Sequence, residues 1–168
     1  MIACVDVYYQ DVGVQAAGVG FLNWTDSLPS AEAVITINDV EPYQSGEFYR
    51  RELPCILAIL ERLPQTIQTV IVDGYVWLGD ENAPGLGAYL YEALTQKVAV
   101  IGVAKKRFYS AQLVQEVLRG SSQNPLYVSA IGIELVTAAQ HIQSMHGEYR
   151  IPTLLKRVDQ LSRSQTPG

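Results

Sequence analysis

The sequence predicts an α/β protein whose mixed sheet, an antiparallel meander followed by parallel strands, is flanked by helices. Three β-branched and aromatic runs, at 2–9, 14–23 and 33–40, follow one another with short connections, which is typical of a meander. Short apolar runs then alternate with helical patterns, as in sheets covered by helices. The length of 168 residues indicates one domain, assigned to 1–163, with a polar flexible tail at 164–168.

The spacing of apolar residues predicts the later elements. Leucine and isoleucine recur at i, i+3, i+4 and i+7 between Gly46 and Leu63, which predicts an amphipathic helix that Pro64 ends. The run 69–73 is a compact strand closed by Asp-Gly. Further strands are predicted at 98–103 and 126–129, and helices at 85–96, 111–119, 132–145 and 153–162.

Composition narrows the class of protein. The formal net charge of −5 argues against tight non-specific binding to nucleic acid. It leaves room for a metal-dependent nuclease, because such an enzyme concentrates carboxylates at its site. The ten tyrosines can stack on bases, although packing within strands is their commoner use.

Other features bear on the surroundings of the chain. Cys4 and Cys55 lie in apolar runs, so we expect buried, reduced thiols, and two cysteines alone do not make a zinc site. No apolar stretch reaches about 18 residues, so no transmembrane helix is expected. The N-terminus lacks the basic start of a signal peptide. These features predict a cytoplasmic protein with no membrane partner.

Three carboxylates occupy places where apolar residues are expected. Asp6 lies inside the first strand, Asp73 ends the strand at 69–73, and Glu52 shares a helix side with Ile56 and Leu60. A buried carboxylate needs a partner, an ion or water. Acidic groups that converge from two strands and a helix would suit Mg²⁺ or Mn²⁺, which can activate water and hold a phosphodiester.

Plainer interpretations stay open for two of the three. An aspartate before glycine, as at Asp73, is often only a turn residue. Glu52 follows Arg50 and Arg51, and such a residue is commonly a solvated helix charge. Asp6 is the hardest to explain without a functional role.

Several stretches match one known family when they are taken in order. They are ACVDVYY, PYQSGEFYRRELP, IVDG, IGVAKKR, NPLYVS and YRIP. Within the second, Tyr43, Gly46, Arg51 and Glu52 fall in register, while Ser45 replaces a turn proline. Together these stretches resemble the endonuclease V family over nearly the whole chain, although each motif alone is weak.

The resemblance implies a ribonuclease H-like fold and a hydrolase of DNA repair. Members cleave nucleic acid, DNA or RNA, near deaminated bases, above all hypoxanthine, the base of inosine. By resemblance Asp6, Glu52 and Asp73 would bind Mg²⁺ or Mn²⁺, and Lys105 would contact the scissile region or orient the nucleophile.

The resemblance also implies how the base would be recognised. Tyr43 would act as a wedge beside the displaced base, and Gly46 and Gly74 would let the backbone approach it. An enzyme that reads a base edge must take the base out of the stack, and an aromatic ring can fill the gap.

The sequence departs from the family in two places. YVWLGDENAPG is acidic where the family has a basic His-Pro-Arg segment, and Ile133 follows Gly132 where the family carries a metal-centre histidine. Glu134 is a possible substitute for that histidine, while His141 and His146 are expected on a helix surface. The chain is also shorter than usual members.

Three functions therefore stay open. The first is a divalent-metal-dependent endonuclease acting near deaminated bases. The second is a degenerate relative that binds nucleic acid or another partner with weak or no cleavage. The third is a nuclease with a changed substrate, such as single-stranded RNA. The sequence leaves the preferred lesion and the oligomeric state open.

Overall fold

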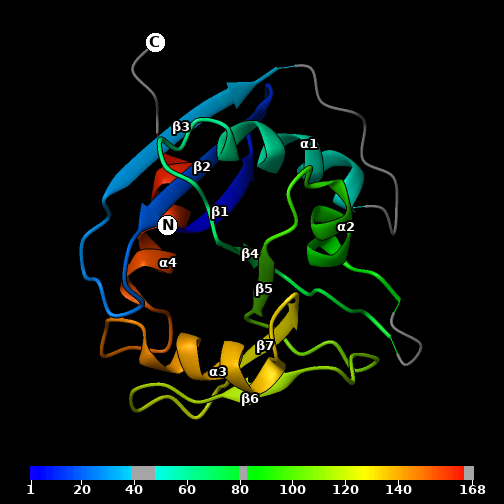
Figure 1. Ribbon diagram of the computed structural model, residues 1–168, viewed down its shortest axis with the longest axis vertical. Helices are drawn as coiled ribbons and strands as arrows, with labels where there is room; N and C mark the ends of the chain where they lie inside the picture. The colour runs from blue at the N-terminus through cyan, green and yellow to red at the C-terminus, as the bar shows by residue number, and fades with distance from the viewer. Residues whose placement is uncertain (39–47, 80–82, 165–168) are drawn as a thin grey trace.

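The computed structural model describes residues 1–38, 48–79 and 83–164 (Figure 1). Its sheet has seven strands in the order β3-β2-β1-β4-β5-β7-β6. The strands are β1 (Ile2–Tyr9), β2 (Val14–Phe21), β3 (Ala31–Ile37), β4 (Thr69–Asp73), β5 (Ala99–Ala104), β6 (Gln115–Val117) and β7 (Leu126–Ile131). The helices are α1 (Phe48–Leu60), α2 (Leu86–Ala93), α3 (Leu135–Ser144) and α4 (Thr153–Arg163).

The predicted meander and the parallel strands are confirmed. β1 pairs antiparallel with β2, and β2 with β3, while β4 runs parallel to both β1 and β5. Cys4 lies opposite Ile71, and Asp73 opposite Val103. Because parallel strands end at the same edge, this register places Asp73 and Lys105 at the carboxyl ends of β4 and β5, close to Asp6 inside β1.

The helix predicted at 111–119 is wrong. This segment contains β6, which pairs antiparallel with β7, and β7 in turn pairs antiparallel with β5. A short run such as Leu113–Leu118 can satisfy a strand or a helical turn, and the hydrogen bonds offered by the edge of β7 decide for the strand.

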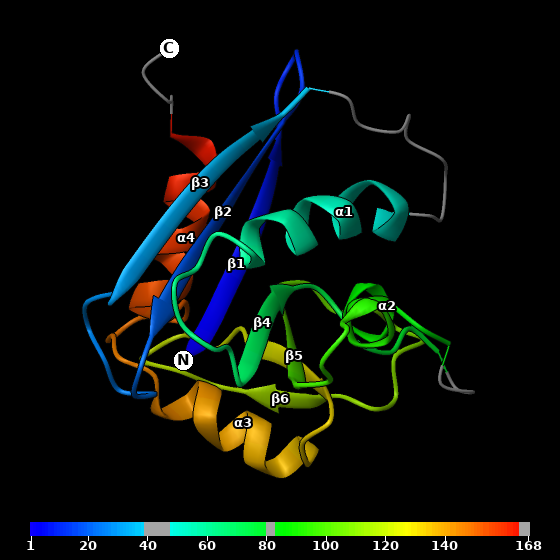
Figure 2. The same ribbon diagram turned by 45° about the horizontal axis from the view of Figure 1, so that its top comes forward.

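Helices cover both faces of the sheet (Figure 2). α1 and α2 pack on one face and α3 and α4 on the other, so the sheet separates two apolar cores. α1 ends at Leu60, before the predicted end at Leu63, and its buried side carries Ile56 and Leu60 as expected. Cys4 and Cys55 are buried free thiols, one in each core. In the part of the chain that the structure describes, every helix is too short or too polar to span a membrane.

Candidate active site

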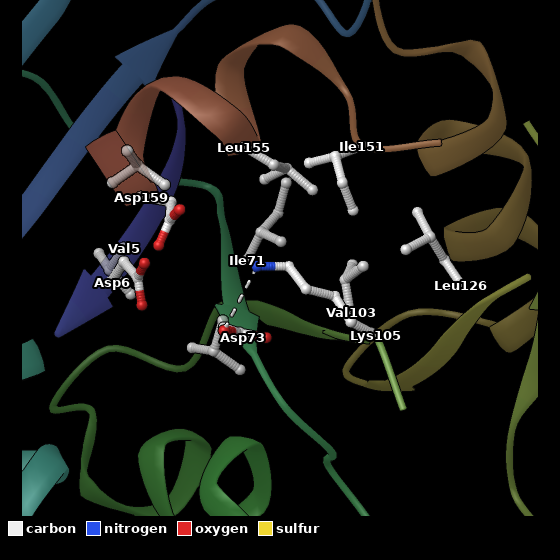
Figure 3. A pocket seen from close by; sticks show the side chains of 12 residues that line it. Val5, Asp6, Ile71, Asp73, Val103, Lys105, Leu126, Ile151, Leu155 and Asp159 are labelled. Carbon is white, nitrogen blue, oxygen red and sulfur yellow. Dashed lines mark ion pairs between the residues drawn. The ribbon is translucent and has the colours of Figure 1, made fainter. Parts of the chain in front are cut away.

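Asp6, Asp73 and Lys105 line one cavity at the carboxyl ends of β1, β4 and β5 (Figure 3). Its volume is about 30 Å³, which is room for a water molecule or two. The Lys105 Nζ lies 3.9 Å from the Asp73 Oδ2. The rest of the wall is largely apolar, formed by residues such as Ile71, Val103 and Leu155. The sheet therefore brings two carboxylates and one ammonium group to a small pocket with largely apolar walls.

A fourth charged residue of this cavity, Asp159, was missed by the sequence analysis. It comes from α4, which packs against β1 and β2. Its carboxyl group shares a hydrogen bond with that of Asp6, and Figure 3 shows the two groups next to each other. A signal was available, because Leu155, Asp159 and Ser162 share one side of α4 at i, i+4 and i+7.

Local contacts hold both members of this carboxyl pair. The backbone N–H of Val7 donates to the Asp6 Oδ1 at 2.9 Å, and the Ser162 hydroxyl donates to the Asp6 Oδ2 at 3.5 Å. The Arg163 guanidinium donates to Asp159 at 3.0 Å, one turn further along α4. The pair is thus fixed between the first strand and the last helix.

Glu52 reaches a second, larger cavity on the other side of Asp73. This cavity has a volume of about 270 Å³ and is lined by Glu52, Asp73 and Gly74 together with three tyrosines. Two of these, Tyr49 and Tyr89, are stacked with ring centroids 3.7 Å apart. Asp73 lines both cavities, so it lies between the space around Asp6 and the space around Glu52.

Gly74 has a conformation that other residues rarely adopt. Its φ is +137°, and a Cβ built there would meet no atom within 4 Å. The backbone is therefore open to the second cavity at the residue that follows Asp73.

The carboxylates of the site are electrostatically strained. Burial, the hydrogen bond with Asp159 and the charge of Asp73 raise the pKa of Asp6 to about 7. Burial and the charge of Asp73 raise the pKa of Glu52 to about 7. Desolvation also raises the pKa of Asp73, and the charge of Lys105 opposes it. Asp159 moves the other way, because Arg163 and Asp6 hydrogen bond to its charged form and lower its pKa.

The donor set suits a hard divalent cation. Every charged oxygen near Asp73 belongs to a carboxylate, and Mg²⁺ and Mn²⁺ prefer such ligands. Burial first, and then the charge of Asp73, raises the pKa values of Asp6 and Glu52, while Lys105 lowers the pKa of Asp73. Within the described ranges, however, no three His, Cys, Asp or Glu side chains are arranged to hold an ion as they stand. The chemistry of the oxygen donors suits a metal, although their present arrangement does not form a complete site.

The raised pKa values predict that the metal-free protein is less stable at alkaline pH. Between the ordinary carboxyl pKa near 4 and about 7, the folded protein binds more protons at Asp6 and Glu52 than the unfolded chain does. This stabilisation is complete below about pH 4 and is lost as the pH rises through about 7. We expect the free energy of unfolding, measured by urea denaturation in EDTA, to fall by about 2 kcal/mol between about pH 5 and pH 8. Asp6→Asn should flatten the dependence, and an unchanged slope would contradict the assignment.

The remaining residues considered from the sequence lie elsewhere. Tyr43 and Gly46 fall outside the described residues. Glu134 is exposed at the start of α3 and does not line either cavity. His146 is exposed, whereas His141 is half-buried and stacks on Trp24 with centroids 4.4 Å apart. The further carboxyl group beside Asp6 is therefore that of Asp159, and no residue next to Ile133 lines the cavity.

Comparisons with known proteins show the family and the fold of the chain. The family model for endonuclease V matches residues 1–120. The endonuclease V of Desulfurococcus amylolyticus is 28% identical over 181 residues, covering 98% of this chain and 80% of that protein. The crystal structure of the endonuclease V from Streptomyces avermitilis has a TM-score of 0.76 at 27% identity, covering 96% of this chain and 79% of the other.

A protein whose structure was solved in complex with DNA has the same fold. Endonuclease V of Ciona intestinalis, solved with a 24mer DNA containing an inosine followed by a ribo-adenosine, has a TM-score of 0.79 at 19% identity. It is covered over 84% of its length by 96% of this chain. The ribonuclease H-like fold that the resemblance predicted is thus confirmed. The family model spans more than two thirds of the sequence, and the chain belongs to the endonuclease V family.

Proposed function

We propose that this protein is a divalent-metal-dependent endonuclease that hydrolyses a phosphodiester near a deaminated base, hypoxanthine in particular. The observation that carries the proposal is the place of Asp73 between two cavities. One is small, acidic and next to Lys105, and the other is wide enough for a planar ligand and lined by tyrosines. A phosphodiester and a displaced base need two such spaces side by side.

In this function Asp6, Glu52 and Asp73 would hold Mg²⁺ or Mn²⁺. The ion supplies a water of lowered pKa and a counter-charge for the phosphodiester. The carboxylates must be ionised to hold it, so Asp6 and Glu52 would have to give up the protons that burial favours on them. Asp159 keeps Asp6 in place and adds a further oxygen donor at the same edge. Lys105, beside Asp73, would hold a phosphate oxygen of the strand.

The displaced base would occupy the second cavity. Its volume of about 270 Å³ is close to the lower end of small-ligand pockets, about 300 Å³. The stacked rings of Tyr49 and Tyr89 offer a flat apolar wall, and Gly74 leaves backbone groups accessible to the polar edge of a base. This arrangement supports recognition of one base outside the stack.

Cleavage of labelled strands tests the proposal directly. Strands of DNA and RNA that contain one inosine, and matched strands with adenosine, are incubated with Mg²⁺, with Mn²⁺ or with EDTA. We expect metal-dependent cleavage near inosine, faster with Mn²⁺ because it tolerates an incomplete ligand set. Absence of cleavage under every condition would leave only the fold in common with the family.

Tyr43→Ala should weaken recognition of the base rather than the chemistry. If the ring stacks in the gap left by the displaced base, its loss costs about 1–3 kcal/mol of binding. Steady-state kinetics on the inosine strand should then show a raised KM with little change in kcat. Tyr43→Phe is the matched control and should behave like the wild type, whereas a fall in kcat alone would contradict the wedge role.

A second candidate function is binding of nucleic acid with weak or no cleavage. One observation favours it, since no three side chains of the described residues are arranged to hold an ion. Inosine-dependent binding that is the same in Mn²⁺ and EDTA, without cleavage, would select this alternative.

A further inference from the structure

A basic and aromatic loop leaves the sheet directly beside the carboxylates. It begins at Lys105, after the last residue of β5, and continues as Lys106, Arg107, Phe108 and Tyr109. Three of the chain's twelve lysines and arginines therefore stand in consecutive positions here. Two large rings follow them, and Phe108 is 43% and Tyr109 86% exposed. Such exposure of aromatic side chains next to positive charge is a feature that folding alone does not explain.

Tyr75, a neighbour of the acidic site, holds the loop in place. The Tyr75 hydroxyl donates to the Lys106 carbonyl at 2.6 Å and accepts from the Phe108 N–H at 2.9 Å. Its ring also packs against Phe108 with centroids 6.0 Å apart. Tyr75 comes two residues after Asp73 and lines the second cavity. One side chain thus connects the loop to the second cavity.

A second anchor fixes the start of the loop. The Arg150 guanidinium donates to the carbonyl oxygens of Lys105, Asn124 and Pro125. These bonds tie the end of β5 to the segment that precedes β7. The loop therefore presents its charges and rings in a defined direction instead of sampling many.

The loop also differs in charge from its surroundings. The protein as a whole has a net charge of −5, and Asp6, Asp73 and Asp159 line the cavity that Lys105 also lines. A polyanion approaching these carboxylates needs positive charge nearby. Lys106 and Arg107 are exposed and supply it, and the Arg107 guanidinium lies 5.4 Å from the Tyr109 ring centroid. Cations followed by exposed rings match a single strand, which offers both phosphates and unstacked bases.

We propose that the loop 106–109 is a platform for a single strand of nucleic acid. Lys106 and Arg107 contact its phosphates, and a base next to the cleavage position stacks on Tyr109. The inference rests on the proposed function in one respect, because the strand held here is the one presented to the carboxylates. It adds a binding surface outside both cavities and assigns selectivity for single-stranded over fully paired substrate to this surface.

Binding in EDTA tests the charges without cleavage. Fluorescence anisotropy follows a labelled single strand of about 20 nucleotides, long enough for one site. Lys106→Gln/Arg107→Gln should weaken binding about 25-fold near 0.1 M salt and reduce the slope of log K against log salt by about 1.4. The matched control is Arg62→Gln/Lys97→Gln, which also removes two exposed cations. Lys97 precedes β5, at the opposite end of that strand from Lys105, and this control should bind like the wild type.

Substitutions of Tyr109 test the stacking. Tyr109→Ala should weaken binding by about 5- to 150-fold with an unchanged salt slope, because a base–aromatic contact carries no charge. Tyr109→Phe keeps the ring and should retain wild-type affinity. Tyr109 is 86% exposed, so neither change should lower the melting temperature. A duplex of the same sequence should bind more weakly than the single strand and should not respond to Tyr109→Ala.

The outcomes separate this inference from the proposed function. Equal binding by the wild type, the loop variants and the control would overturn the platform, even if inosine strands are cleaved. No binding of single strands by the wild type at low salt would also overturn it. Binding that depends on the loop, in a protein that cleaves nothing, would support the platform and reject the nuclease. A stronger response with the duplex than with the single strand would reassign the loop to paired substrate and refute the proposal as stated.

Discussion

Asp73→Asn is expected to lower the cleavage rate by more than about 10³-fold and to leave the fold intact. Asparagine keeps the shape of the side chain but removes the charge that would hold the ion, and metal assistance contributes several kcal/mol to such reactions. The change also removes the like charge that raises the pKa values of Asp6 and Glu52. The metal-free variant should therefore melt at the wild-type temperature or above it at alkaline pH, although it loses the exposed contact with Lys105.

A remote carboxamide serves as the matched control. Glu116→Gln removes an exposed carboxylate of the edge strand β6 and should leave both cleavage and melting unchanged. Single-turnover gel assays and thermal melts in EDTA measure the two effects. Wild-type cleavage by Asp73→Asn would remove Asp73 from the proposed machinery. A large fall in melting temperature would instead show that the charge serves folding.

Arg119→Met is expected to lower the free energy of unfolding by about 3–5 kcal/mol. Arg119 is only 4% exposed, and its guanidinium donates to four carbonyl oxygens in the segment between α3 and α4. Methionine fills a similar volume but leaves these acceptors without donors. The same segment leads into the helix that carries Asp159, so the loss should reach the site as well.

Arg157→Met makes the same chemical change at an exposed position. Arg157 pairs with Glu32 at 2.9 Å on the surface, and such pairs contribute about 0–1 kcal/mol. Urea denaturation of both variants gives the comparison. If the two substitutions destabilise equally, the buried carbonyl contacts of Arg119 contribute little beyond a surface ion pair.

Much of the fold followed from local patterns in the sequence. The strands at 2–9 and 69–73 are long apolar runs with clear ends, and their expected places in the sheet are those observed. Glu52 was expected to face the sheet because it shares a side of its helix with Ile56 and Leu60, and it lines a cavity with Asp73. Periodicity and strand direction thus predicted that Asp6 and Glu52 each lie beside Asp73, but in the described residues no three of these side chains are arranged to hold one ion.

Two features depended on contacts between distant segments. The three-residue strand β6 exists because β7 offers it an edge, and its own residues fit a helix equally well. Asp159 belongs to the site only because α4 packs across β1 and β2, which no local pattern states. A substitute for the family's histidine was expected near Ile133, whereas the carboxyl group beside Asp6 is that of Asp159 on α4.

The hydrogen bond between Ser162 and Asp6 spans 156 positions of the sequence. Strand β1 is synthesised long before helix α4, so the carboxyl pair of Asp6 and Asp159 forms only after α4 has been made. A nascent chain, which folds from its N-terminus onward, would carry the sheet without the finished acidic pocket. Loss of α4 by early termination or by proteolysis would have the same effect. The order of the elements thus delays the finished acidic pocket until α4 has been made and has packed against β1.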